Sequence, residues 1–309
     1  MIKKYREFIF EDEDNDEETP STSASSTTDT SFKSRFEKFK EFLSKKSAGS
    51  SSTETSPTDG SAPRSYTPGS GDFSNVDKMI ETVVKYLNKH GLTNPIVQRA
   101  ILATIGKESG FTATKEASYK TTSPARIKSI FGSRFSSLSD DEINRIKQDD
   151  TAFWEKVYGG EWGKRNLGNT QPGDGAKYLG RGFNGITGRA NYQTYTNMLR
   201  KAGSSVDLIS NPEILEKSPD VSAEVNALYF LRGLSDPNIK RKYGNSNPND
   251  FKNFDTALKA VVNANAGSGT DITKGFAKVS YDAAVAANNR LGNKFDRAVS
   301  SSPDTSRTA

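Results

Sequence analysis

The sequence predicts a mainly α-helical domain with one small β element, preceded by a long disordered N-terminal arm. From Phe73 onward, apolar residues recur at the three- and four-residue spacing of amphipathic helices. Alternating strand patterns are scarce, and the glycine-rich stretch around 177–188 is the one candidate β region. Residues 11–72 are dominated by Ser, Thr, Asp, Glu, Gly and Pro, a composition that buries too little apolar surface to offset the ordering entropy.

These patterns divide the chain into an arm of residues 1–72, a domain of residues 73–298 and a disordered tail of residues 299–309. The arm contains two short amphipathic segments, at about 2–10 and 31–46, whose apolar residues fall on one helical face. Both are too short to be stable helices in water on their own. They are interpreted as docking peptides that fold on a partner. A membrane-surface helix is an alternative for the second segment, which ends in Lys45 and Lys46, and nascent helices without a role are the alternative for both.

The first helices of the domain have clear end signals. A helical apolar pattern begins at Val76 and runs to His90, which Gly91 follows as a typical C-terminal residue. Asn94 and Pro95 then predict the start of a mostly apolar helix that has Glu108 in its final turn. Further helices are expected around 124–131, 139–148, 151–158, 191–202, 219–231, 254–264 and 273–290, and Ser139 to Glu142 matches a capping box.

Composition excludes several kinds of site. The chain has no cysteine and a single histidine, His90, so it has no thiolate metal site, no zinc site built on several histidines, and no catalytic triad that omits His90. No metal or cofactor is implied. Residues 73–309 carry a net charge of +9, which favours an anionic surface such as a cell wall or simply aids solubility. No membrane-spanning run and no signal peptide are recognised.

The stretch from Lys177 to Tyr192 carries the strongest functional signal. Its glycines allow sharp turns and close approach of the backbone to a ligand. Arg181, Thr187 and Asn191 can hydrogen-bond to hydroxyl and amide groups, and its aromatic residues can pack under a sugar ring. Together with two upstream glutamates, the stretch indicates cleavage of a glycosidic bond in an amino-sugar polymer.

Glycosidic hydrolysis normally needs one protonated carboxyl group and one ionised carboxylate. Glu108 is assigned as the acid, because burial and a helix C-terminus both disfavour an anion. Lys107 is expected to point elsewhere, since adjacent helical residues face different directions. Glu116, in a polar loop, is assigned as the base that holds a water. The alternative is that both are solvated surface glutamates.

Four segments of this chain resemble family-19 glycoside hydrolases, the plant-type chitinases and the phage endolysins and virion-associated lysozymes of the same fold. The resemblance spans about 90–270 and rests on segments 106–111, 116–119, 168–175 and 180–192 in the family's order. It implies a lysozyme-like helical fold with a cleft between two lobes, and hydrolysis that inverts the anomeric centre.

The resemblance also assigns residues. Glu108 matches the family's general acid and Glu116 its general base, with the carboxyl groups expected roughly 6.5–9.5 Å apart. Thr187 matches the residue that positions the attacking water, and Asn191 and Asn263 match asparagines that contact the sugar chain. Tyr119 and Arg181, which stand in the same motifs, complete the candidate substrate-binding residues, although Arg181 is also expected to buttress the cleft through a carboxylate.

Three positions depart from the family's pattern. Lys107 replaces a histidine, Gly185 replaces a glutamine that contacts the sugar, and the Asn-Gly-Gly element is altered around Asn263. These differences point away from a plant-like chitinase and toward a divergent peptidoglycan enzyme.

We therefore expect a peptidoglycan hydrolase, a muramidase that cleaves the β-1,4 glycosidic bond and that the arm tethers to a capsid or tail protein of a phage virion. The expected location is the virion or the host cytoplasm. The alternatives are a chitinase and a catalytically silent structural or wall-binding protein. No nucleic-acid-binding motif accompanies the basic charge.

Overall fold

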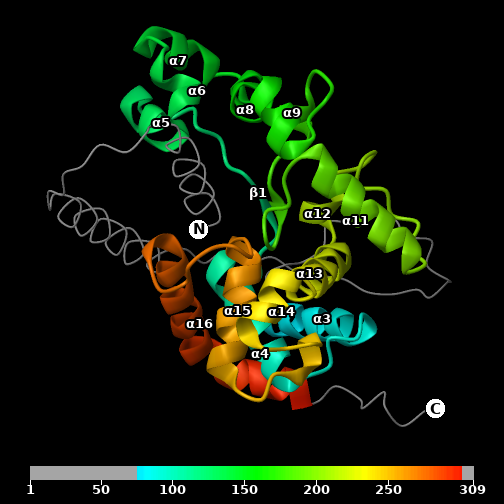
Figure 1. The fold of residues 1–309 in the computed structure, drawn as a ribbon. Coiled ribbons are helices and arrows are strands. Elements are labelled where there is room, and N and C mark those ends of the chain that lie inside the picture. The colour runs from blue at the N-terminus through cyan, green and yellow to red at the C-terminus, as the bar shows by residue number, and fades with distance from the viewer. Residues whose placement is uncertain (1–74, 301–309) are drawn as a thin grey trace, which may run out of the picture. The chain divides into compact units, whose positions relative to one another are not determined.

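The computed structural model describes residues 75–300 of the chain. Helices account for most of these residues, and they are accompanied by one sheet of two very short strands (Figure 1). The predicted mainly α class is confirmed for this part of the chain. The expected arm of residues 1–72 and residues 301–309 of the expected tail lie outside the described range. Within that range, no helix combines the length and the apolarity that a membrane span requires.

Most helices follow one another with short connections, and the longest connections are residues 109–123, 178–188 and 202–213. Their bounds are α3 Val76–Lys89, α4 Pro95–Glu108, α5 Pro124–Phe131, α6 Ser133–Ser136, α7 Asp140–Ile146, α8 Asp150–Tyr158, α9 Gly160–Leu167, α10 Asp174–Lys177, α11 Arg189–Lys201, α12 Ile214–Lys217, α13 Pro219–Leu234, α14 Pro237–Tyr243, η2 Pro248–Asp250, α15 Phe254–Ala266 and α16 Gly275–Ser300.

The predicted end signals place the helix termini correctly. The Asn94 side chain accepts a hydrogen bond from the Ile96 N–H at the start of α4, where Pro95 is the first residue. In α7, Ser139 and Glu142 form the predicted capping box. Helices α13, α15 and α16 extend beyond their predicted ends, and α16 runs to Ser300, because tertiary packing continues where the local apolar pattern fades.

Two helices of seven or eight residues were not expected. The α9 segment contains two glycines and the α14 segment three basic residues, so neither has a strong apolar period. Each is held by residues that pack inward, Leu167 in α9 and the fully covered Ile239 in α14. Burial against the rest of the domain therefore stabilises helices that local propensity does not predict.

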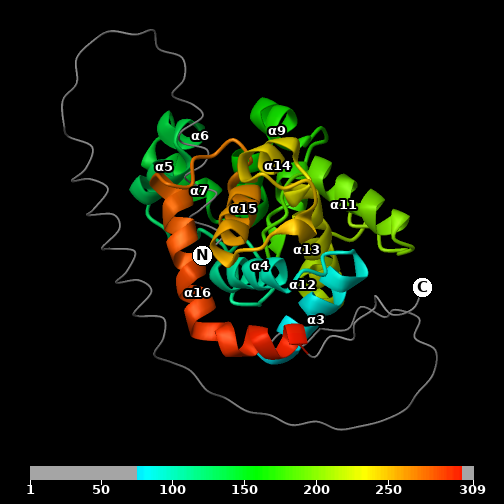
Figure 2. The ribbon, with the colours of Figure 1, turned by 60° about the horizontal axis from the view of Figure 1, so that its bottom comes forward.

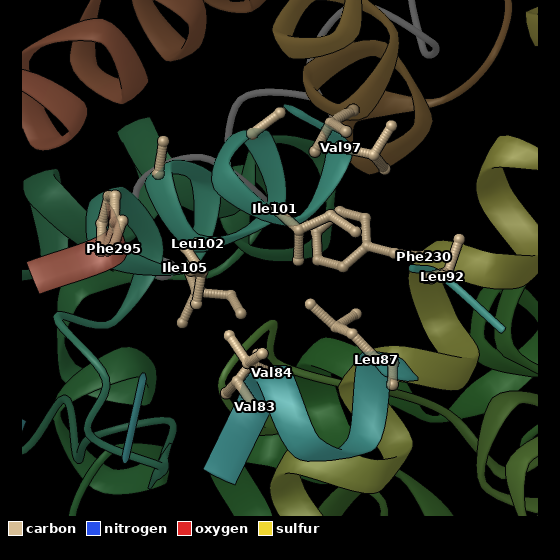
Figure 3. Close-up of a cluster of buried hydrophobic side chains, with 14 of the residues drawn as sticks. Val83, Val84, Leu87, Leu92, Val97, Ile101, Leu102, Ile105, Phe230 and Phe295 are labelled. Atoms are coloured by element: carbon tan, nitrogen blue, oxygen red, sulfur yellow. The ribbon is translucent and has the colours of Figure 1, made fainter. Parts of the chain in front are cut away.

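The largest apolar core surrounds α4. Eleven of its fourteen residues are buried, as its apolar sequence predicted. Helices α3, α15 and α16 pack against it, and α13 packs against α3 and α15 (Figures 1 and 2). Ile101 and Ile105 of α4 lie among Val84 and Leu87 of α3 and Phe230 of α13 (Figure 3). This packing fixes the helix whose last residue is Glu108.

Two smaller apolar clusters lie outside that core. One is aromatic, is built from α5 to α8, and contains Tyr119, Phe153 and Trp154, with Trp162 packed against it. The other joins α11, α12 and one side of α13 through Tyr192 and Leu215, among others. Both tryptophans therefore serve packing.

The β element is smaller than the glycine-rich stretch that predicted it. Strand β1, Thr114–Lys115, pairs antiparallel with β2, Arg181–Gly182, with Thr114 opposite Gly182. The rest of the stretch forms a turn in which Arg181 and Ile186 exchange two backbone hydrogen bonds. This ladder brings the loop after α4 against the glycine-rich stretch.

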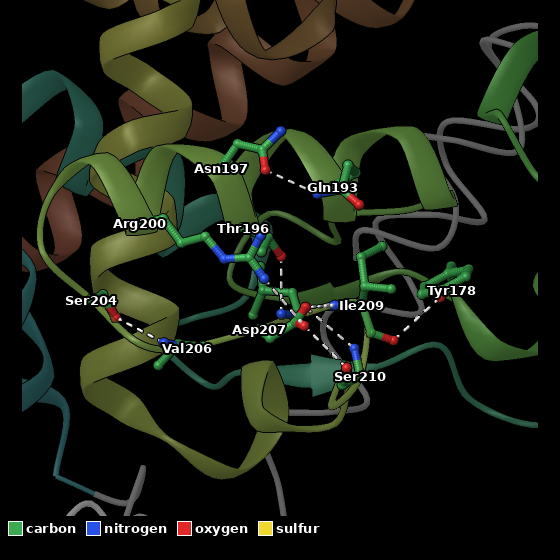
Figure 4. A network of polar contacts seen from close by, with 11 residues as sticks. Tyr178, Gln193, Thr196, Asn197, Arg200, Ser204, Val206, Asp207, Ile209 and Ser210 are labelled. Carbon is green, nitrogen blue, oxygen red and sulfur yellow. Dashed lines mark hydrogen bonds and ion pairs between the residues drawn. The ribbon is translucent and has the colours of Figure 1, made fainter.

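A polar network holds the loop that follows α11. Asp207 accepts hydrogen bonds from the Ile209 N–H and from Arg200, and Thr196 accepts one from the Leu208 N–H (Figure 4). The Tyr178 hydroxyl donates to the Ile209 carbonyl over 3.2 Å. The beginning of the glycine-rich stretch is thereby attached to this loop.

Candidate active site

Glu108 and Glu116 are both buried. Glu108, the last residue of α4, exposes 4 % of its surface, and Glu116, the residue after β1, exposes 7 %. A buried carboxylate needs hydrogen-bond donors or a cation, and each glutamate has them. The alternative that they are solvated surface glutamates is therefore wrong.

Glu108 lies in a cluster of polar side chains from three helices. Asn265 of α15 donates a hydrogen bond from Nδ2 to Glu108 Oε1 over 2.8 Å. The Lys107 ammonium forms an ion pair with the same oxygen and donates to the Ser280 hydroxyl of α16 over 2.6 Å. The expectation that Lys107 points elsewhere is wrong. Its long side chain is buried, so its charge is stabilised by turning back to the nearest acceptors.

Glu116 is held by donors from two other elements. The Tyr158 hydroxyl of α8 donates to Oε1 over 2.6 Å, and the Gly180 N–H donates to Oε2 over 3.0 Å. The Glu116 N–H in turn donates to the Gly180 carbonyl. A carboxylate oxygen has two lone pairs, so each oxygen can still accept a further hydrogen bond.

Gly180 allows Thr187 to lie beside Glu116. A Cβ at Gly180 would lie 3.0 Å from Thr187 Oγ1 and 3.2 Å from Glu116 Cδ, which is closer than ordinary side-chain contacts. Thr187 Oγ1 donates to the Gly185 carbonyl, and Asn191 donates from Nδ2 to the Thr187 carbonyl. The structure thus brings three of the predicted residues, Glu116, Thr187 and Asn191, into one neighbourhood.

The turn that carries Thr187 also accounts for Gly185. This residue has φ of 59°, in the left-handed region that glycine adopts at little cost. A glutamine at this position would be strained. The left-handed backbone of this turn therefore favours glycine at position 185.

Tyr119 and Arg181 are both engaged within the protein. The Tyr119 ring is stacked on Phe153 with centroids 5.0 Å apart, inside the aromatic cluster. Arg181 donates to Glu216 over 3.2 Å and to the Lys177 carbonyl over 2.7 Å. The carboxylate partner predicted for Arg181 is therefore Glu216.

The Asn263 side chain is hydrogen-bonded to other residues of the protein and does not contact Glu108. Its Oδ1 accepts hydrogen bonds from Lys242 and Tyr243, and its Nδ2 donates to the Gly267 carbonyl. Asn265, two residues further on, is the asparagine that contacts Glu108. Residues two apart on a helix face different directions, so only one of them can face Glu108, and the sequence does not say which.

An ion pair joins the segments on either side of the glycine-rich stretch. Arg189, at the start of α11, donates two hydrogen bonds to Asp174 of α10, at 2.6 and 2.5 Å. Burial alone would raise the pKa of Asp174, but the Arg189 hydrogen bonds, with one from the Gln171 N–H, hold that pKa below its usual value. Thr187 and Gly180 lie between the two halves of this pair in the sequence.

The backbone between the two glutamates is strained at one residue. Phe111 has φ of 66° and is the one non-glycine residue with positive φ between 75 and 300. Its ring is fully buried in the α4 core, 6.1 Å from the Phe295 ring. Such strain persists where packing enforces it and is common near functional sites.

The arrangement provides two buried carboxylates from separate elements, each with its own donors. Within residues 75–300, no cluster of three or more acidic or histidine side chains has the geometry of a metal site. The chemistry available to these residues is proton transfer by Glu108 and Glu116, with Thr187 as a polar neighbour of Glu116. Sequence reasoning did not identify Tyr158, Asn265 and Ser280, because none of them lies in a motif with the glutamates.

Comparison with known proteins adds no assignment. No model of a protein family matches the chain, and a search of the curated proteins likewise gives no match.

Proposed function

We propose that this protein is a peptidoglycan hydrolase, a muramidase that cleaves the β-1,4 bond between amino sugars with inversion. Glu108, which must take up a proton and so leave its ion pair with Lys107 before it can act, donates that proton to the oxygen of the leaving sugar as the bond from that oxygen to the anomeric carbon breaks. Glu116 removes a proton from the water whose oxygen forms the new bond to that carbon. A lysozyme-like two-lobed arrangement and the arm as a virion anchor belong to the same proposal.

The approach of both Glu116 and Thr187 to the open side of Gly180 carries this proposal. A general base and a hydroxyl group at one place can hold one water between them, because each still has a free acceptor lone pair. The Gly180 N–H and the Tyr158 hydroxyl fix the carboxylate, so its orientation does not depend on substrate. Fixed orientation of the base is what inversion by direct water attack needs.

Clearing of purified Gram-negative peptidoglycan tests the proposal. Wild type should clear the suspension, and Glu116→Gln should reduce the rate roughly 100-fold or more. Glu81→Gln, an exposed glutamate on α3, is the matched control and should keep full activity. NMR of the first product should show the α-anomer. Release of the β-anomer would contradict direct water attack.

Parallel assays distinguish the other functions. Cleavage of chitin oligomers with no clearing of peptidoglycan would make the protein a chitinase. No cleavage of either polymer by wild type would leave a structural or wall-binding role.

A further inference from the structure

Among residues 75–300, two asparagines have side-chain amides that are closed to solvent and have no hydrogen-bond partner. In Asn226 of α13 and in Asn184, just after β2, both the amide oxygen and the amide nitrogen are closed to solvent and unpaired within residues 75–300. Asn226 exposes only 3 % of its surface. Leaving a buried amide unpaired costs free energy, and most native amides avoid it. Binding of a ligand that hydrogen-bonds to the amide would offset this free-energy cost.

Asn226 lies on a face of α13 that joins the two halves of the candidate site. Ser222, Asn226 and Tyr229 are spaced by four and three residues and therefore share that face. At one end, the Ser222 hydroxyl lies 3.6 Å from where a Cβ on Gly182 of β2 would be. At the other end, the Tyr229 hydroxyl donates to the carbonyl of Asn265, whose side chain donates to Glu108.

Apolar clusters lie on both sides of this face. Ala223 and Ala227 belong to the core around α4, whereas Val225 and Leu228 belong to the cluster with α11 and α12. Asn226 therefore has no polar side chain of its own helix beside it other than Ser222 and Tyr229. Ser222 already donates to the Leu215 carbonyl and Tyr229 to the Asn265 carbonyl.

We propose that Asn226, with Asn184, binds the acetamido group of an N-acetylated sugar and selects for acetylated substrate. This inference rests on the proposed function and assigns a specificity-determining contact to the same site. An acetamido group presents one N–H donor and one carbonyl acceptor, the complement of the Oδ1 acceptor and Nδ2 donor of an asparagine. A free amino sugar has no carbonyl, so it would leave the asparagine Nδ2 unpaired.

Binding requires a local rearrangement, because neither amide is reached by solvent in this conformation. Asn184 lies in a turn with glycines of positive φ at 182, 185 and 188, whose backbone tolerates such a change. Substrate then pairs an amide that folding leaves unpaired. Selectivity for the acetylated sugar is strong in this situation, because a free amino sugar would leave the buried asparagine amide without a hydrogen-bond partner.

The experiment compares two substrates, namely soluble glycan strands from peptidoglycan and the same strands after chemical N-deacetylation. For each variant of the full chain, the quantity measured is the ratio of kcat/KM for the two. We expect Asn226→Leu and Asn226→Ala to lower this ratio at least tenfold, and Asn184→Ala to lower it less. An unchanged ratio in an active Asn226 variant overturns the inference and leaves the proposed function intact. Wild type that cleaves neither substrate overturns both.

Thermal unfolding separates a binding amide from a structural one. Asn226→Leu, whose side chain has the same number and branching of heavy atoms, should unfold at or above the wild-type temperature, because it removes an unpaired buried amide. Asn169→Ala is the control, since Asn169 is buried with both amide groups bonded, to the Tyr158 carbonyl and the Arg189 N–H, and it should unfold earlier. Unfolding of both Asn226 variants several degrees below wild type would show that the amide holds the fold and would overturn the inference.

Discussion

Lys107 and Glu108 are consecutive residues, yet their side chains form a buried ion pair at the end of α4. Ser280 and Asn265, from the two helices packed against α4, provide the other hydrogen bonds of the pair. The proposed general acid, Glu108, therefore forms an ion pair with Lys107, although the sequence pattern predicted that the Lys107 side chain points away from it. Any substitution of Glu108 also changes the environment of Lys107.

The first prediction concerns that pair. Glu108→Gln should lower the free energy of unfolding by about 3–5 kcal/mol, because it leaves the Lys107 ammonium buried without its carboxylate. The double variant Lys107→Met with Glu108→Gln should regain most of this loss, since neither charge is then buried. Urea unfolding of wild type, both single variants and the double variant measures the coupling. Additive effects would show that the pair is not formed in solution.

The second prediction concerns the close approach at Gly180. Gly180→Ala places a methyl group 3.0 Å from Thr187 Oγ1 and 3.2 Å from Glu116 Cδ, so these groups must move apart. We expect a loss of about 1–3 kcal/mol of stability and a large loss of hydrolysis. Gly269→Ala is the control, because nothing lies within 4 Å of its added carbon and its φ is not positive. Full hydrolysis by Gly180→Ala would mean that Thr187 need not lie beside Glu116.

The third prediction concerns the hydroxyl donor to Glu116. Tyr158→Phe keeps the ring stacked on Trp154, with centroids 5.5 Å apart, and removes the hydroxyl that donates to Glu116. Stability should fall by about 1.5–3 kcal/mol, the usual contribution of a hydrogen bond to a charged group. The activity measurement should show a lower kcat at nearly constant KM, since the hydroxyl orients the base. A change in KM alone would place Tyr158 in substrate binding instead.

The fourth prediction is a dependence of stability on acid. The pKa of Asp174 is held below its usual 3.8 in the folded protein, so the group stabilises the fold above pH 3.8 and loses that contribution as the pH falls through the lowered value. Asp174→Asn should therefore be less stable than wild type at neutral pH, and the difference should shrink below pH 3.8. Asp141→Asn, at an exposed position in α7, is the control and should leave the acid dependence unchanged. A constant difference between Asp174→Asn and wild type across the acid range would contradict the assignment.

Local signals in the sequence determined where helices α4 and α7 begin. Asn94 with Pro95, and Ser139 with Glu142, act within a few residues of themselves, so the caps of α4 and α7 follow from the sequence alone. The even apolar character of α4 likewise predicted that it is buried on most sides. The motifs that contain Glu108 and Glu116 also predicted both of them as candidate catalytic residues from the sequence.

Tertiary structure alone decided how these residues are used. The direction of the Lys107 side chain depends on Ser280, which is 173 positions away in the chain. Which of Asn263 and Asn265 donates a hydrogen bond to Glu108 depends on which side of α15 faces α4. The lack of a hydrogen-bond partner for Asn226 depends on the residues that pack around α13. Hydrogen bonding and burial of polar side chains are properties of neighbours in space, and a local pattern contains no information about neighbours that are distant in sequence.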